Sequence, residues 1–362
     1  MTRLPQPRPG ILEIAPYIGG KAKAEGANRT LRLASNENPL GASPRAKAAY
    51  LAGGDDLHRY PDGGARALRD AIAATEGLEA EKLVCGAGSD ELIQLIVRAY
   101  AGPGDEVLYS QHGFLVYPLA AQGAGAKPVT APERDLTADV DALLAGVTDR
   151  TRLVFLANPN NPTGSYLGRA EVARLQAGLP SDVLLVLDAA YAEYVSDPDY
   201  SNGADLVAAK DNVVMLRTFS KIHGLAALRL GWAYAPDHVI DVINRIRGPF
   251  NVGAPAQAAG IAALADQDHV AQSVAENQAN LARFRAGVLA LGLEAPPSVG
   301  NFLLVRFTDP AKSAAEAERH LAGQGILVRH MAAYGLPEAL RITIGQQAEM
   351  EVVLDALRDF LA

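Results

Sequence analysis

Short apolar runs alternate with amphipathic stretches between about residues 66 and 250. The runs occupy residues 106–109, 153–157, 183–187, 213–216 and 232–235. Continuous apolar runs of this length are typical of strands buried on both faces, so they predict a mostly parallel sheet covered by helices. Residues 89–100 fit one such helix, because they open on polar capping residues and end before Gly102-Pro103-Gly104. The predicted fold class is α/β.

The pattern changes after about residue 255. A long alanine-rich helical region, broken near residues 266–268, continues to about residue 291. Short strands are predicted at 302–306, 326–329 and 340–344, with helices at 312–323 and 347–361. We therefore expect an N-terminal arm with part of a small domain at 1–44, a large domain at 45–250 and a smaller α+β domain at 251–362.

Composition narrows the functional class. The 362 residues are 49% hydrophobic and carry a formal net charge of −8, with no lysine or arginine run that would bind nucleic acid. No stretch reaches the ~18 uninterrupted apolar residues of a membrane span, and the N-terminus lacks the apolar core of a secretory signal. The single cysteine, Cys85, has apolar neighbours and is predicted to be a core thiol, and no histidine or cysteine pattern indicates a metal. These features favour a cytoplasmic protein that binds small molecules.

Polar segments follow three of the predicted strands. They are Asn158-Pro-Asn-Asn161-Pro-Thr-Gly164, Asp188-Ala-Ala-Tyr191, and the group Thr218, Ser220 and Lys221. In open α/β sheets ligands bind outside the carboxyl ends of the strands, so we expect these segments to line one crevice. Each alone has a structural alternative, because Asn-Pro and Pro-Thr-Gly form turns, an aspartate often caps a helix and Tyr191 could be a core residue.

Lys221 gives the three segments a common chemistry. A lysine amine condenses with a carbonyl, and Thr218, Ser220 and Arg229 supply donors for a phosphate. A buried carboxylate such as Asp188 would stabilise a protonated ring nitrogen. The combination indicates pyridoxal 5′-phosphate, whereas a lysine in a turn is otherwise simply solvated.

The turn Gly86-Ala-Gly-Ser-Asp90 opens the helix predicted at 89–100 and offers backbone N–H groups to the same phosphate. It is not a dinucleotide fingerprint, because Glu91 stands where the third glycine of that motif belongs. A nicotinamide dehydrogenase is therefore disfavoured, and it would leave the three strand-end segments unexplained.

These motifs together resemble those of the fold-type-I pyridoxal-phosphate-dependent aminotransferases, nearly from end to end of the chain. The matching segments are Ser35-Asn-Glu-Asn-Pro39, Arg59-Tyr-Pro-Asp-Gly63, Gly86-Ala-Gly-Ser-Asp-Glu91, Asn158 to Gly164, Asp188-Ala-Ala-Tyr-Ala-Glu193, Thr218-Phe-Ser-Lys221 with Arg229, Pro249-Phe-Asn-Val252 and Leu340-Arg-Ile-Thr-Ile-Gly345. The resemblance implies a three-layer large domain and a smaller α+β domain. Within the family the motifs are most similar to those of the enzymes that act on histidinol phosphate.

The resemblance also implies roles for the matching residues. Lys221 would bind the cofactor and act as general base, Asp188 would hold the ring nitrogen, Asn161 and Tyr191 the ring oxygen, and Phe114 would stack on the ring. The cofactor phosphate would be bound by Ser89, Asp90, Thr218, Ser220 and Arg229, joined by Tyr60 from a neighbouring subunit of a homodimer. The substrates would be bound by Tyr17, Asn161, Arg329 and Arg341.

The substrate is less firmly indicated than the chemistry. The first hypothesis is amino transfer between histidinol phosphate and 2-oxoglutarate, a step of histidine biosynthesis. Related aromatic transaminases share most of the motifs, so phenylalanine or tyrosine remains an alternative. A pyridoxal-phosphate decarboxylase of the phosphothreonine type would share the cofactor site, and a non-catalytic cofactor-binding regulator is a further alternative.

Overall fold

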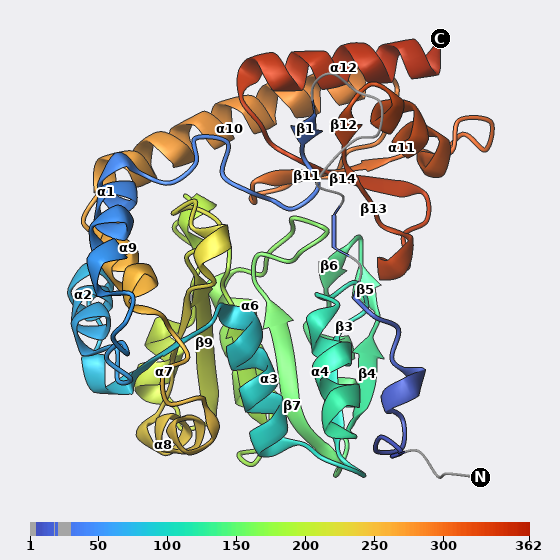
Figure 1. Cartoon of the computed structure of the whole chain (residues 1–362). Coiled ribbons are helices and arrows are strands. Elements are labelled where there is room, and N and C mark those ends of the chain that lie inside the picture. The colour runs from blue at the N-terminus through green and yellow to red at the C-terminus, as the bar shows by residue number, and fades with distance from the viewer. Residues whose placement is uncertain (1–4, 18, 21–29) are drawn as a thin grey trace.

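The structure, a computed structural model, describes residues 5–17, 19–20 and 30–362. Residues 1–4, 18 and 21–29 of the predicted N-terminal arm lie outside the described residues. The described part contains a large sheet at the bottom of Figure 1 and a smaller α+β layer above it, with the C-terminal helix at the top. This arrangement confirms the predicted α/β fold class.

The large sheet has seven strands in the order β2-β10-β9-β8-β7-β3-β4. Their bounds are β2 Leu83–Gly86, β3 Glu106–Ser110, β4 Lys127–Ala131, β7 Thr151–Ala157, β8 Leu184–Asp188, β9 Val213–Thr218 and β10 Gly231–Tyr234. Only β10 is antiparallel to its neighbours β2 and β9, so the sheet is mostly parallel, as predicted. The apolar pattern does not predict β2 or β4. Strand β4 is an edge strand that contains Pro128, so it lacks a continuous apolar run.

Successive residues of each central strand belong to different cores, because side chains alternate between the two faces of a sheet. Leu185 and Leu187 of β8 pack in one cluster and Leu184 and Val186 in the other. The first cluster includes side chains of α2 (Arg66–Glu76), α5 (Val140–Ala145), α6 (Arg169–Gly178), α7 (Ala204–Ala209) and α9 (Ala254–Leu264). The second includes side chains of α3 (Ser89–Tyr100), α4 (Val116–Ala124) and α8 (Asp237–Ile246). The continuous apolar runs thus result from burial on both faces.

The smaller layer has its own core, which includes Phe284, Leu303 and Ile342. Its antiparallel sheet has the order β11-β14-β13. Its elements are α10 (Gln267–Ala290), β11 (Phe302–Arg306), α11 (Ala314–Gly323), β12 (Ile326–Leu327), β13 (Arg329–His330), β14 (Ala339–Thr343) and α12 (Gln347–Leu361). The strand predicted at 326–329 is therefore two strands, because the chain changes partner at Val328: β12 pairs with β1 (Leu31–Arg32) and β13 with β14.

Minor elements complete the described chain. Strands β5 (Glu133–Arg134) and β6 (Thr137–Ala138) form a two-stranded ribbon, and α1 (Pro44–Ala52) packs on α9. Short 3₁₀ helices occur at Ile11–Glu13, Gly53–Asp56, Ala80–Lys82, Ala192–Tyr194, Ala226–Leu228 and Ala332–Tyr334. Among the described residues no helix is long and apolar enough to cross a membrane. Cys85 is a buried free thiol whose pKa is raised to about 12 by burial, which confirms its prediction as a core residue.

The division of the chain at residue 250 stays a prediction. Val252, Ala256 and Leu264 pack in the core of the large sheet, and α9 lies against α1 and α2. The chain turns at Asp266 into α10, whose Phe284 packs in the small core. This packing favours a division near residue 266, between α9 and α10.

The segment before α1 joins the small layer to the edge of the large sheet. The N–H of Leu33 donates to the carbonyl of Leu327 at 2.8 Å, and the N–H of Thr343 donates to the carbonyl of Leu33 at 2.8 Å. Leu33 is thus held between two segments of the small layer. The next three residues, Ala34 to Asn36, leave this position and enter the pocket described below.

Candidate active site

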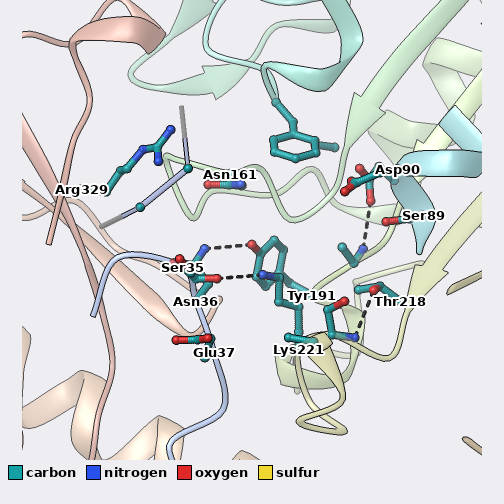
Figure 2. Close-up of a pocket in the computed structure, with 18 of the residues that line it drawn as sticks. Ser35, Asn36, Glu37, Ser89, Asp90, Asn161, Tyr191, Thr218, Lys221 and Arg329 are labelled. Atoms are coloured by element: carbon teal, nitrogen blue, oxygen red, sulfur yellow. Dashed lines mark hydrogen bonds between the residues drawn. The ribbon is translucent and has the colours of Figure 1, made fainter. Parts of the chain in front are cut away.

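A pocket of about 280 Å³ lies where the carboxyl ends of the parallel strands meet the small layer. Strands β2, β3, β7, β8 and β9 run in one direction, so the segments that follow them converge at one edge of the sheet. The pocket brings together all predicted site residues except Tyr60, namely Tyr17, Ser89, Asp90, Phe114, Asn161, Asp188, Tyr191, Thr218, Ser220, Lys221, Arg229, Arg329 and Arg341. Figure 2 shows part of this set around Lys221 and Tyr191.

The three asparagines of the segment after β7 have two different roles. Asn158 accepts from the N–H of Leu167 at 2.7 Å and donates to its carbonyl at 3.1 Å, and Asn160 donates to Thr163 Oγ1 at 2.9 Å. These two side chains fix the loop, as the structural alternative for turn formers expects. Asn161 faces the pocket, where its Oδ1 accepts from Arg341 at 2.5 Å.

Lys221 follows β9, and its side chain lines the pocket. Its Nζ donates to the carbonyl of Ser35 at 3.0 Å and lies 5.8 Å from the centre of the Tyr191 ring. Burial lowers the pKa of Lys221 to about 8, and the positive charge of Arg341 adds to this effect. A minor fraction of the amine, about one tenth at pH 7, is therefore uncharged and hence nucleophilic, which is far more than for an exposed lysine.

Asp188 ends β8 and is the buried carboxylate of the site. Tyr117 donates to its Oδ2 at 2.7 Å and the N–H of Ala190 donates to its Oδ1 at 3.2 Å. Burial raises the pKa of Asp188 to about 6, against the opposing effect of these two hydrogen bonds. An ionised carboxylate in this position would be stabilised by a cationic ring N–H. Tyr117 was missed by sequence analysis, because a tyrosine inside an amphipathic helix gives no sign that its hydroxyl has a buried partner.

An anion cradle lies at the N-terminus of α3. Its N-cap, Gly88, supplies no side chain to cap the helix, so the first amides remain available. Gly88 has φ 83°, and a Cβ there would come within 2.5 Å of the Arg229 guanidinium. Glycine therefore lets the guanidinium approach the helix end. Arg229 pairs with the Asp90 carboxylate at 3.2 Å and donates to Ser220 Oγ at 3.4 Å.

Two arginines of the small layer face the pocket from the opposite side. Arg341 donates through Nη2 to the carbonyl of Ala34 at 2.6 Å, while its buried Nε has no hydrogen-bond partner among the described residues. The Arg329 guanidinium lies 5.5 Å from the centre of the Tyr17 ring. An unpaired guanidinium N–H and a second arginine suit anionic groups of a substrate.

Tyr60 lies away from this pocket. Its side chain is 83% exposed and stacks on Phe250 with ring centres 4.6 Å apart. Its predicted role as a phosphate ligand from a neighbouring subunit stays a prediction. Conversely, Ser35, Asn36 and Glu37 line the pocket although sequence analysis gave them no role. The segment Ser35 to Pro39 contributes to the family resemblance, but its individual positions carry no chemical signal.

A buried ion cluster lies behind the pocket. Arg217 of β9 pairs with Glu193 at 2.9 Å and with Glu76 of α2 at 3.3 Å. The cluster ties the segment that carries Tyr191 to the strand that precedes Lys221. His223 is buried against Phe219, and burial lowers its pKa to about 4.

The residues of the pocket fit pyridoxal 5′-phosphate. The helix end with Arg229 suits its phosphate, Asp188 suits its ring nitrogen, and Lys221 provides the amine that an aldehyde requires. The open cradle at Gly88 and the absence of a capping side chain are observations of this chain that support the fit.

The chain matches the family model for class I and II aminotransferases over residues 28–357. It is 59% identical over 357 residues to a histidinol-phosphate aminotransferase from Rhodospirillum centenum, with 99% of each chain covered. A second relative of the same name, from Paramagnetospirillum magneticum, is 57% identical over 358 residues and again covers 99% of each chain. The crystal structure of the histidinol-phosphate aminotransferase from Sinorhizobium meliloti in complex with pyridoxal-5′-phosphate matches with a TM-score of 0.92 at 30% identity, covering 99% of this chain and 98% of that one.

The low pKa of Lys221 predicts its reactivity. In the cofactor-free protein, the neutral amine is present above pH 8 and is lost as the pH falls through that value, because burial disfavours the charged form. An amine-directed reagent should therefore label Lys221 with a midpoint near pH 8, measured by peptide mapping across a pH series. The exposed Lys210 is the internal control for the extent of reaction. A labelling midpoint for Lys221 at the usual value of an exposed lysine would contradict the assignment.

Proposed function

The chain belongs to the class I and II aminotransferases, and we propose that it transfers the amino group of histidinol phosphate to 2-oxoglutarate, giving imidazole acetol phosphate and glutamate. The observation that carries the proposal is one pocket that holds an amine of lowered pKa, a buried carboxylate and a helix-end anion cradle, with two further arginines opposite. The relatives named for this reaction support the choice of substrate.

Pyridoxal 5′-phosphate, when bound, would carry the amino group between the two substrates and draw electrons from the substrate carbon that bears it. Lys221 is the residue to which it would attach, and its freed amine would move the proton at that carbon. Asp188 would hold the ring nitrogen protonated. Asn161 and Tyr191 would bind the ring oxygen, and Phe114 would cover the ring face.

The cofactor phosphate would be bound by the amides of Ser89 and Asp90, the hydroxyls of Thr218 and Ser220, and the guanidinium of Arg229. The hydroxyl of Thr218 already accepts from the N–H of Ser220 at 3.1 Å, which orders this turn. The helix dipole and Arg229 favour a dianion here, and the Asp90 carboxylate helps to orient Arg229.

Substrate recognition would depend on the arginines of the small layer. Arg341 would bind the carboxylate next to the amino-bearing carbon of glutamate, a group that histidinol phosphate lacks. Arg329, with Tyr17 and Asn161, would bind the phosphate at the far end of histidinol phosphate. Two separate cationic groups allow one pocket to accept two differently charged substrates.

The proposal includes a homodimer that completes each site with Tyr60 of the opposite subunit, in the cytoplasm. The exposed position of Tyr60 outside its own pocket supports this assignment. The unpaired, buried thiol of Cys85 is compatible with a reducing compartment.

The central test compares the chain with its Lys221→Ala variant. The native protein loaded with pyridoxal phosphate should absorb visible light, and borohydride should fix the pyridoxyl group on Lys221. It should form glutamate from 2-oxoglutarate faster with histidinol phosphate than with equal concentrations of phenylalanine or tyrosine. The Lys221→Ala variant should lose the label and the activity, whereas Lys210→Ala should keep both. A label on another lysine, or faster turnover of an aromatic amino acid, would contradict the proposal.

A shared active site predicts complementation between two defective subunits. Co-expression of Tyr60→Ala with Lys221→Ala chains should give mixed dimers in which one of the two sites has both native residues. Random pairing makes about one quarter of all sites native, because half of the dimers are mixed. Activity above that of both parent variants is therefore expected. Absence of any gain in isolated mixed dimers would show that Tyr60 does not act across an interface.

Arg329 and Arg341 should separate the two half-reactions. Arg329→Ala should lower kcat/KM for histidinol phosphate roughly 10- to 100-fold, the scale of one charge-assisted hydrogen bond of ~1.5–3 kcal/mol, and should affect the glutamate half-reaction less. Arg341→Ala should instead slow the glutamate half-reaction more than the half-reaction with histidinol phosphate. Single-turnover measurements with each substrate provide the comparison, and equal losses in both half-reactions would contradict the division of roles.

A further inference from the structure

Asn36 occupies a constrained position at the junction of the small layer and the large sheet. Its side chain is 1% exposed and its φ is 55°, in the left-handed region that few residues other than glycine adopt. A conformation of this kind persists only where the surroundings determine it. The function proposed above assigns no task to this residue.

Groups of the small layer hold both the backbone and the side chain of Asn36. Its N–H donates to Thr343 Oγ1 at 2.9 Å, and its carbonyl accepts from Asn301 Nδ2 at 3.0 Å. Thr343 Oγ1 also lies 3.2 Å from Asn36 Oδ1. Thr343 ends β14 and Asn301 immediately precedes β11, so both anchors belong to one small sheet.

These contacts decide which way the Asn36 amide faces. Thr343 Oγ1 accepts from the backbone N–H of Asn36, so its own proton is available to donate to Oδ1. In the opposite orientation the amide NH₂ would also point at Thr343 Oγ1, which would leave the threonine proton without an acceptor among the described residues. The NH₂ group therefore faces the other way, where it donates to the Tyr191 hydroxyl at 2.8 Å, as Figure 2 shows.

The Tyr191 hydroxyl has one proton to donate, and the side-chain NH₂ of Asn36 occupies one of the positions at which this oxygen accepts hydrogen bonds. The Tyr191 ring is held by Phe302 at 5.2 Å and packs with Ile222, so the hydroxyl cannot move far. Among residues 5–17, 19–20 and 30–362 no other side chain bonds to this hydroxyl. Burial raises the pKa of Tyr191 well above its usual value, so the phenol keeps its proton.

We propose that Asn36 is a positioning residue. Its side-chain NH₂ donates to the Tyr191 hydroxyl and thereby directs the Tyr191 proton into the pocket, toward the ring oxygen of the cofactor. The inference rests on the proposed function for the identity of the group that receives this proton. Because Asn36 is anchored to the small sheet, the direction of the proton depends on the contact between the two layers.

The test is Asn36→Asp, which keeps the shape of the side chain but replaces the N–H donor by an acceptor. The Tyr191 proton should then turn toward residue 36, and the cofactor ring oxygen should lose a donor. A hydrogen bond donated to the ring oxygen stabilises the negative charge of that oxygen, so the oxygen attracts the proton on the neighbouring Lys221 nitrogen less strongly. Loss of the hydrogen bond should therefore raise the pH at which this proton leaves and the bound cofactor changes colour. We expect this spectral midpoint to rise by about one unit, the same direction as in Tyr191→Phe.

Two comparisons separate this route from a general effect of added charge. Asn38→Asp introduces a carboxylate two positions away, where the native amide donates to Ile222 and Ser273 and not to Tyr191. It should shift the midpoint less than Asn36→Asp does. In a Tyr191→Phe background, Asn36→Asp should add little further shift. Equal shifts for both aspartates, or full additivity with Tyr191→Phe, would overturn the inference.

Asn36→Gly provides a second variant that accepts the positive φ and adds no charge. Without the incoming hydrogen bond Tyr191 is a weaker and freer donor, so the midpoint should rise in the same direction by a smaller amount. An unchanged midpoint in both Asn36 variants, with native cofactor loading, would overturn the role of Asn36 alone. Failure of the native protein to bind the cofactor at Lys221 would instead contradict the proposed function.

Discussion

The common direction of five strands is the constraint on which the site depends. Strands β2, β3, β7, β8 and β9 share one direction, so the five segments after them meet at one edge. Both faces of the sheet are packed with apolar side chains, so the strand ends have fixed positions. Polar residues at these ends therefore lie close together in space although they are far apart in sequence. The buried Arg217 cluster adds a second link between two of these segments.

Burial at this edge changes the acid–base behaviour of the two central groups in opposite directions. It lowers the pKa of Lys221 to about 8 and raises that of Asp188 to about 6, because each charged form loses hydration. Near neutral pH the carboxylate is still ionised and part of the amine is uncharged. Tyr117 contributes to this balance, since its hydrogen bond opposes the rise for Asp188. Two groups with separated pKa values suit a site in which one holds a cation and the other moves a proton.

Sequence patterns predicted the helices and strands whose burial follows a local periodicity. They missed strand direction and side-chain contacts, which depend on residues far away in the sequence. The helix at 89–100 and the apolar strands were predictable because local periodicity reflects burial on known faces. The antiparallel direction of β10 was not, because direction depends on the path of the chain. The pocket residues after the strands were predictable because their polar segments directly follow apolar runs. The contacts of Tyr117 with Asp188 and of Asn36 with Tyr191 join residues 71 and 155 positions apart, and no local pattern reports such pairs.

The segment from Ala34 to Asn36 links the two layers at the level of individual atoms. Its three successive residues contact Arg341, Lys221 and Tyr191 in turn. The same segment continues from Leu33, which is bonded on both sides to the small layer. A displacement of the small layer relative to the large sheet would therefore change three site contacts at once. The pocket thus depends on the contact between the layers as much as on the sheet.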